Sequence, residues 1–508
     1  MKNTLTILLL FAAGLIFGQT ANPACTFDNP TPIKTTKGVN PTFTPPVNPP
    51  NTRPKPPGDK RIIYWIHGLG GSVDSWVRPA EVTAYQSPGN KIPGYPPRKV
   101  ESLNLTYSQF TLTGAGYNLH TKLVTAGDAF CAANKITDKS TNFIISHSQG
   151  GLVSRAADKY YADQGIEEER RFGGIVTFGS PHLGARILNN QDLHAPMINE
   201  GCEALADGPV RAKVYATTLI PFFGYPIAES LSGIGDKICN FLTQAILPTM
   251  IEGQQQPITS DYKVGAPALE ELNGYESTLP RVACFGEEKD PVAWRQMYSF
   301  HVKKPVEFPV FEANQDDLLV DKVGDLRDHY YSKYLKWKGI AIALLAAKLP
   351  PFVVRLPAIV FARKVYKGYH RGYTWLTDAN EKYMSVIGAT TQKTTTQTIT
   401  ECQCQTTDYE GKVTYSTWYA NDPSECPVSS STYESCGPIT TTLVNTQTVT
   451  LPNDGAVLAE SAAGFSGAVQ VKMKDSNHQQ MRNDSNTKDV LIRLFDGKLG
   501  DYFKADVQ

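Results

Sequence analysis

A serine stands in a segment whose sequence is typical of a buried strand, a sharp turn and a helix. Residues 142–151 read NFIISHSQGG, with Ser148 at the expected apex of the turn. A strand and a helix that meet at such a turn pass close together, so the positions two residues before and after the serine must be small. They are Ser146 and Gly150. The pattern predicts an exposed nucleophile, and the alternative is a serine that only completes a glycine-rich turn.

An upstream glycine-rich loop would stabilise the negative charge that develops when a serine attacks a carbonyl carbon. The apolar run Ile62–Ile66 is expected to be a strand, and it leads into HGLGG at residues 67–71. Backbone N–H groups aimed at an oxyanion are each worth about 3 kcal/mol. We expect one donor from Gln149 and the other from Leu69. Residues expected to support this loop are His67, Gly68, Gly70 and Gly150. Hydrogen bonding within the turn, rather than proton transfer, is the expected role of His67.

A third segment completes a recognisable set of motifs. The apolar run 174–178 ends in GSPHLGA at residues 179–185. Together the three segments resemble the secreted bacterial lipase and esterase branch of the α/β-hydrolases, in which an HGxGG loop, an elbow serine and a strand ending in GSPHxG occur in this order. Ser146 departs from the usual glycine. The resemblance implies an α/β fold with a mostly parallel sheet flanked by helices, and a serine esterase or lipase activity.

The acid and the base of such a hydrolase follow the serine along the chain. Residues 452–457 read PNDGAV, which resembles the NDGxV loop that carries the family's acid and implies Asp454. His478 follows the alternating run Val469–Met473, in the usual place for the family's histidine. We expect His478 to take the Ser148 proton and deliver it to the leaving alcohol, while Asp454 fixes the imidazole tautomer.

Other residues compete for both roles. The alternative acids are Asp290, Asp316 and Asp317, and the alternative bases are His301, His329 and His370. Only Asp454 and His478 combine a preceding strand, a loop and the correct chain order. The competing histidines are therefore interpreted as structural or surface residues.

The N-terminus indicates export. Lys2 precedes the apolar run Leu5–Phe17, which is too short to span a bilayer comfortably. We interpret residues 1–18 as a secretory signal peptide, which predicts a secreted, extracellular or periplasmic protein. Cys25 lacks the upstream leucine of a lipoprotein signal, so a lipid anchor is not favoured. Residues 19–58 are rich in proline, threonine and asparagine and are expected to form an extended linker.

Nine cysteines in an exported chain predict disulfide bonds. Four of them lie in one stretch rich in threonine, serine and tyrosine: Cys402, Cys404, Cys426 and Cys436. Their uneven spacing favours disulfides over a zinc site. Cys131 and Cys284 lie among apolar residues that suit buried thiols. The formal net charge is zero and no long basic run occurs, so nothing recommends a nucleic-acid partner.

The 508 residues exceed one typical domain. The hydrolase core is expected in two pieces, residues 59–185 and 445–508. A mainly helical cap or lid is expected over residues 186–389, and a small disulfide-stapled β extension over 390–444, with a hairpin turn at 409–411. The apolar helices of the insertion would form either a lid over the serine or the ordinary core of a second domain. Prolines interrupt their apolar stretches, so no transmembrane segment is expected in the mature chain.

We therefore predict a secreted serine hydrolase that cleaves carboxylic esters, with lipids favoured, through an acyl-enzyme intermediate. Its partner would be an ester or lipid substrate, including a lipid interface. No cofactor is expected, and calcium is not supported because Gln480 stands where some lipases of this branch have an aspartate. Two alternatives stay open. One is an amidase, peptidase or thioesterase on the same fold, and the other is a surface-binding module with vestigial chemistry.

Overall fold

The fold was analysed in a computed structural model of the chain. It describes residues 43–44, 53–56, 60–84, 92–223, 239–240, 243, 255–301, 308–313, 317–346, 352–419, 428–430 and 434–507. The predicted signal peptide and nearly all of the predicted linker lie outside these residues.

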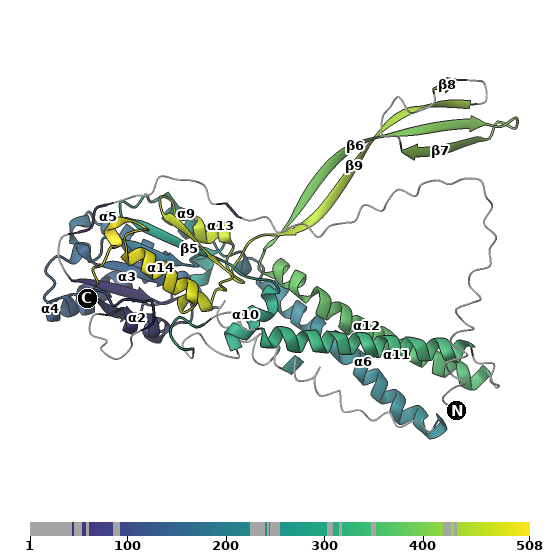
Figure 1. Ribbon diagram of the computed structural model, residues 1–508, viewed down its shortest axis with the longest axis horizontal. Coiled ribbons are helices and arrows are strands. Elements are labelled where there is room, and N and C mark those ends of the chain that lie inside the picture. The colour runs from purple at the N-terminus through teal and green to yellow at the C-terminus, as the bar shows by residue number, and fades with distance from the viewer. Residues whose placement is uncertain are drawn as a thin grey trace. The chain divides into compact units, whose positions relative to one another are not determined.

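A six-stranded parallel sheet forms the centre of the fold, in the order β2-β1-β3-β4-β5-β10 (Figure 1). Its strands are β1 Arg61–Ile66, β2 Val100–Leu105, β3 Phe143–His147, β4 Ile175–Phe178, β5 Arg281–Glu287 and β10 Val469–Lys474. Every residue of β1, β3 and β4 is buried, as expected for parallel strands covered on both faces. The predicted fold class is confirmed.

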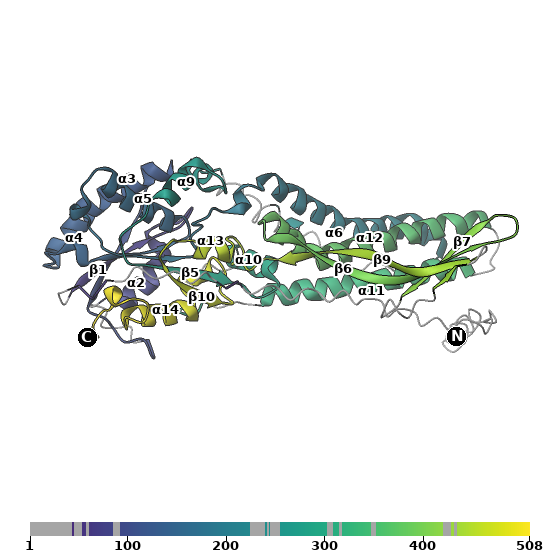
Figure 2. The ribbon, with the colours of Figure 1, turned by 90° about the horizontal axis from the view of Figure 1, so that it is seen from above.

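Helices cover the two faces of this sheet (Figure 2). One face packs against α3 Leu112–Lys122, α5 Gln149–Asp163 and α9 Pro267–Gly274. The other face packs against α2 Val77–Thr83 and α14 Ser485–Phe495. Side chains along β3 point alternately to the two faces of the sheet. Ile144 accordingly belongs to the first hydrophobic core and Ile145 to the second. A further short helix, α4, spans Asp128–Ala133.

Two insertions lengthen the connections between strands. Helix α6 (His194–Phe223) and α9 lie between β4 and β5. Between β5 and β10 lie α10 Val292–His301, α11 Leu318–Ala346, α12 Phe352–Val386, a second sheet and α13 Ala459–Ala463. The structure differs here from the expected division, because β5 lies within residues 186–389 yet joins the central sheet. The run Val282–Phe285 has the apolar character of a buried strand, but one apolar run does not reveal which sheet it joins.

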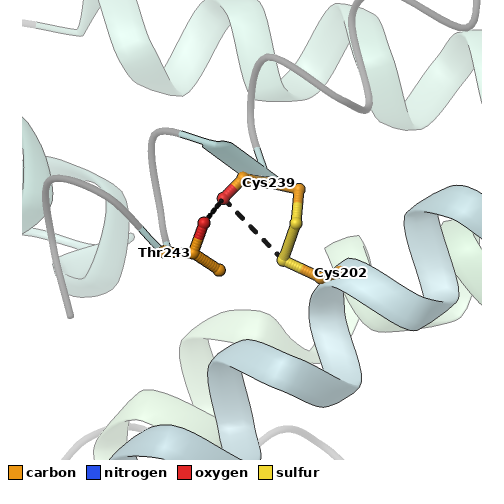
Figure 3. The surroundings of a disulfide bond; sticks show 3 residues. All are labelled: Cys202, Cys239 and Thr243. Carbon is orange, nitrogen blue, oxygen red and sulfur yellow. Dashed lines mark hydrogen bonds between the residues drawn. A yellow bond between two sulfur atoms is a disulfide. The ribbon is translucent and has the colours of Figure 1, made fainter.

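Helices α6, α11 and α12 share a separate hydrophobic core. Small residues allow α6 and α12 to approach closely, since a Cβ atom added to Gly368 would lie 2.8 Å from the Cα atom of Gly208. Cys202 of α6 forms a disulfide with Cys239, whose main-chain oxygen accepts a hydrogen bond from Thr243 at 2.8 Å (Figure 3). Among the described residues, no helix combines the length and the apolar character that crossing a bilayer requires.

A four-stranded antiparallel sheet follows α12, in the order β7-β6-β9-β8. Its strands are β6 Thr390–Thr407, β7 Val413–Tyr419, β8 Ser429–Ser430 and β9 Glu434–Thr450. The predicted hairpin turn is confirmed, because Asp408 exchanges hydrogen bonds with Gly411 and Lys412 across it. A disulfide joins Cys404 to Cys436. Strand β9 continues to Thr450, so the residues expected to open the second core piece pair instead with β6.

The remaining cysteines of the described chain follow the prediction. Cys402 is disulfide-bonded, whereas Cys131 and Cys284 are buried free thiols. Burial also raises the pKa of the Cys284 thiol, which keeps it protonated and unreactive.

Candidate active site

Ser148 occupies the sharp turn between β3 and α5. Its backbone is left-handed, with φ 53° and ψ −129°, a conformation that is strained for a residue other than glycine. The turn passes close to the HGLGG loop, since a Cβ atom on Gly150 would lie 2.3 Å from the main-chain oxygen of His67. Ser146 fits where the usual motif has glycine, because its buried hydroxyl donates to the main-chain oxygen of Val176 at 3.1 Å.

The structure brings Ser148, Asp454 and His478 together. The Ser148 Oγ atom lies 2.9 Å from Nε2 of His478, and Nδ1 of the same ring lies 2.8 Å from Oδ2 of Asp454. An ionised carboxylate only accepts hydrogen bonds, so the Nδ1–H of His478 donates to Asp454. Nε2 is then unprotonated and accepts the hydrogen bond of the serine hydroxyl. Asp454 and His478 are almost fully buried.

The loop after β9 fixes the carboxylate of Asp454. Its Oδ1 atom accepts hydrogen bonds from the main-chain N–H groups of Ala456 and Val457, at 3.0 and 2.7 Å. The main-chain oxygen of Asp454 accepts the N–H of His478 at 2.7 Å. Helix α12 supports the same loop, because the Tyr383 hydroxyl donates to the main-chain oxygen of Gly455 at 2.7 Å. The insertion therefore helps to position Asp454.

Helix α10 supports the loop that carries His478. The side-chain oxygen of Asn477 accepts the main-chain N–H groups of Gln479 and Gln480, at 3.0 and 2.9 Å. Its Nδ2 atom donates to the hydroxyl of Ser299, in α10, at 2.5 Å. Asn477 is fully buried. Its hydrogen bond to Ser299 attaches the loop that carries His478 to helix α10 of the insertion.

The HGLGG loop lies directly against the elbow. A Cβ atom added to Gly68 would lie 2.9 Å from the Ser148 Cβ atom, so a glycine is required there. No described residue accepts a hydrogen bond from the main-chain N–H of Leu69 or Gln149, which leaves both donors for a ligand. His67 holds the turn, with Nδ1 2.8 Å from the Gly68 oxygen and Nε2 3.0 Å from Thr106 Oγ1. Burial lowers its pKa.

The side chain of Gln149 connects this loop to two tyrosines. Its Nε2 atom donates to the Tyr107 hydroxyl at 3.1 Å, and its Oε1 accepts the Tyr262 hydroxyl at 2.9 Å. The Tyr107 hydroxyl donates in turn to the main-chain oxygen of His67 at 3.0 Å. Gln109 completes the network by accepting the N–H of Gly70 at 3.2 Å. No motif marks Tyr107, Gln109 or Tyr262 in the sequence, and Tyr262 lies far along the chain from the other two.

Gly179, the first residue of the GSPHLG motif, lies against Asp454 and His478. Its φ is +59°, and a Cβ atom there would lie 2.9 Å from Oδ2 of Asp454 and 3.2 Å from Nδ1 of His478. The motif therefore leaves room for the hydrogen bond between these two residues. His182 of the same motif is buried, with ring nitrogens near Thr177 Oγ1 at 3.0 Å and an Arg155 nitrogen at 3.2 Å.

The alternative acids and bases that the structure describes have other partners or lie on helices of the insertion. Asp290 is exposed and accepts a hydrogen bond from Asn380 at 3.2 Å, and Asp317 pairs with Arg295. His329 and His370 lie on α11 and α12. Asp316 and the side chain of His301 fall outside the described parts of the chain.

Among the described residues, one cluster has the spacing of metal ligands, namely Cys404, Glu434 and Cys436, and its two cysteines are joined as a disulfide.

Comparisons with known proteins add distant likenesses. No protein-family model and no curated protein matches the chain. Phospholipase PlaB from Legionella pneumophila, in complex with thio-NAD, is 12% identical over 47% of this chain and 39% of that chain, with a TM-score of 0.27. An extracellular α/β-hydrolase from a Paenibacillus species is 12% identical over 44% and 76% of the two chains, with a TM-score of 0.22.

Lipase BlEst2 from Bacillus licheniformis, in its propeptide form, is 11% identical over 79% of this chain and 75% of that chain, with a TM-score of 0.27. The chain spans less than half the length of the Legionella phospholipase. These scores are too low to assign an activity, so the fold is identified from the chain itself. The parallel strand order, the elbow at Ser148 and the order Ser148, Asp454, His478 along the chain together make this an α/β-hydrolase fold.

Proposed function

We propose that the protein is a serine hydrolase that cleaves carboxylic esters through an acyl-enzyme intermediate. The observation that carries the proposal is the continuous hydrogen-bonded chain from Ser148 through His478 to Asp454, with distances of 2.9 and 2.8 Å. A nucleophile, a base within hydrogen-bond reach and a third group that orients the base are what this chemistry requires.

In the proposed reaction, the Ser148 oxygen attacks the ester carbonyl carbon while His478 Nε2 takes the hydroxyl proton. Asp454 stabilises the resulting imidazolium. The N–H groups of Leu69 and Gln149 donate to the oxyanion, and His478 returns the proton to the leaving alcohol. Water then attacks the acyl-enzyme with His478 again as base, which releases the acid and regenerates Ser148.

We favour lipid esters as substrates because the motif set resembles lipases. Amides, peptides and thioesters are the alternative substrates of the same site. A panel of soluble chromogenic esters, anilides and thioesters, matched in acyl group, separates them by kcat/KM. Preference for the anilides or thioesters would replace ester hydrolysis as the function.

A fluorophosphonate probe tests the chemistry itself. We expect it to label the wild-type protein at Ser148 and not to label the Ser148→Ala variant. Ester turnover should fall by orders of magnitude in the same variant, leaving only the residual catalysis of the oxyanion donors. Absence of labelling and of turnover in the folded wild-type protein would favour a vestigial binding module.

We infer export from the N-terminal sequence, and the disulfides Cys202–Cys239 and Cys404–Cys436 support it. Disulfides persist mainly in oxidising compartments. The expected location is therefore extracellular or periplasmic, and cell fractionation with an antibody against the chain tests it.

A further inference from the structure

The helical insertion has an uneven distribution of charge. Residues 329–377 contain nine lysine and arginine residues and no aspartate or glutamate, whereas the whole chain has a formal net charge of zero. This stretch covers the second half of α11 and the first two thirds of α12. Figures 1 and 2 show these two helices side by side. The local excess of basic residues is therefore concentrated on one helical pair.

Aromatic contacts define how α11 and α12 are aligned. The ring centroids of Tyr331 and Tyr373 lie 5.0 Å apart, and those of Tyr334 and Tyr366 lie 6.0 Å apart. The two helices are thus antiparallel, and residues at one level have numbers that add up to about 700. The upward direction is the one toward the end where the chain passes from α11 to α12. In this direction residue numbers increase from Tyr334 in α11 and decrease from Tyr366 in α12.

Ion pairs with α6 neutralise two basic residues of α12 that follow Tyr366 along the helix. Lys382 pairs with Glu200 at 2.9 Å, and Arg371 pairs with Glu203 at 3.2 Å. Exposed basic side chains that take part in none of the salt bridges found among the described residues lie at the level of Tyr334 and Tyr366 and above it. This basic band consists of Lys336, Lys338, Arg363, Lys364 and Lys367. At one level on both helices, positive charge is therefore left without a protein counter-charge.

Exposed apolar side chains lie beyond the basic band, at the end of the helical pair. This helix tip consists of Ile342, Leu345, Leu356 and Val360, which are exposed by 57, 47, 47 and 43%. The antiparallel alignment places Ile342 at the level of Val360, and Leu345 at the level of Leu356. Four apolar side chains on two adjacent helices thus gather one or two turns above the basic residues.

We propose that the helix tip and the basic band together dock on an anionic lipid surface. Apolar side chains at the end of the pair would enter the boundary between headgroups and acyl chains, while the lysine and arginine side chains behind them meet the lipid phosphates. Half-exposed tyrosines behind the band suit the interface as well, since tyrosine is enriched where one end of the ring is apolar and the other wet. The order of the three groups along the helices matches the order of layers in a membrane surface.

Other occupants fit this surface less well. A second copy of the same surface would bring basic band against basic band with no acidic residue between them, which is repulsive. Nucleic acid would satisfy the positive charge, but four exposed aliphatic side chains at the tip contribute nothing to phosphate contacts. An anionic lipid surface satisfies both the charge and the apolar groups.

Vesicle sedimentation tests the proposal independently of hydrolysis when the full chain carries Ser148→Ala. We expect binding to phosphatidylcholine vesicles that contain phosphatidylglycerol and little binding to pure phosphatidylcholine. A basic residue near an anionic surface contributes about fivefold to binding, so Lys364→Gln/Lys367→Gln should weaken it by about 25-fold. Ile342→Gln/Leu345→Gln should weaken vesicle binding by about tenfold. Raised salt should also weaken the vesicle binding of the Ser148→Ala protein that carries no further substitution.

A matched control is available at the other end of α11. Lys322→Gln/Arg327→Gln removes the same charge from exposed positions of that helix and should leave vesicle binding unchanged, with circular dichroism confirming that all variants fold. Equal weakening by the control pair, equal binding to neutral and anionic vesicles, or binding to a short DNA duplex without binding to vesicles would each overturn the proposal. Because Ser148 is already replaced, failure here leaves the proposed hydrolase activity untouched.

Discussion

The Nε2 atom of His147 lies 2.7 Å from the main-chain oxygen of His478. A carbonyl oxygen only accepts hydrogen bonds, so Nε2 of His147 carries the proton and donates it. Burial lowers the pKa of His147 well below its ordinary value, and the positive charge that His478 acquires would lower it further. His147 is therefore a neutral ring that holds the loop carrying His478.

His147→Leu should keep the fold and lower kcat on a soluble ester by up to about 100-fold, because small displacements of a catalytic group cost rate steeply. KM should change little, since His147 lies beneath the elbow. His147→Gln can donate from its amide to the same oxygen and should restore part of the rate. If steady-state kinetics gave the wild-type kcat for the leucine variant, His147 would not be a positioning residue.

Asp454→Asn should lower kcat by about 10⁴-fold, because an amide no longer holds the His478 tautomer that accepts the serine proton. The shape of the side chain is kept, so thermal unfolding should change far less than activity. Asp290→Asn makes the same chemical change at an exposed acid in the insertion and is the matched control. Comparable losses in both variants, or loss only in the control, would move the acid role to Asp290.

Tyr107→Phe should affect both stability and rate. The hydroxyl bonds to the main-chain oxygen of His67 and to the Gln149 side chain, and each buried group left unpaired costs about 1–3 kcal/mol. The oxyanion loop loses one of its supports, so kcat should also fall, by about tenfold. Tyr117→Phe, on the exposed side of α3, should change neither the denaturation midpoint nor kcat. A Tyr107 variant that behaves like this control would contradict the network.

Asp484→Asn should change how stability depends on pH. Burial raises the pKa of Asp484 to about 6, against hydrogen bonds from Ser476 and Thr487 that lower it. The folded state thus holds this proton more tightly than the unfolded state between about pH 4 and 6, and its contribution to the free energy of unfolding falls as pH rises through that window. The stability of the variant relative to wild type should therefore rise by up to about 3 kcal/mol between pH 4 and 6.

Asparagine at position 484 can still cap α14, because its side-chain oxygen can accept the Thr487 N–H as the aspartate does at 2.8 Å. Urea denaturation at a series of pH values measures the effect. Asp489→Asn, at an exposed position of the same helix, is the control and should follow wild type at every pH. A constant difference between the Asp484 variant and wild type would show that burial does not raise this pKa.

The sequence predicted the parts of the site that short motifs describe. Ser148, Asp454 and His478 each follow a strand within a recognisable loop, so their meeting at 2.9 and 2.8 Å could be anticipated from their order. Hydrogen bonds between distant loops could not be anticipated. Tyr107 and Tyr262 are separated by 155 positions and both bond to the side chain of Gln149. The residues next to them in the sequence give no indication of this contact.

Strands were easier to find than their partners. Residues 445–450 were expected to belong to the hydrolase core, but they are the end of β9, which pairs with β6 over its whole length instead of joining the parallel sheet. The apolar run in β5 shows the opposite case, since it is a central strand that lies within a region assigned to the cap. Pairing depends on side chains supplied by remote segments, so one strand's own residues do not specify it.

The insertion between β5 and β10 adds to the separation of Ser148 and His478, which lie 330 positions apart along the chain. During synthesis, Ser148 leaves the ribosome long before Asp454 and His478 exist. A nascent or truncated chain that ends within the antiparallel sheet carries a serine with no imidazole to activate it. Under the proposed mechanism such a chain would be inert toward esters, so the order of translation would delay hydrolysis until the segment that carries His478 has been made.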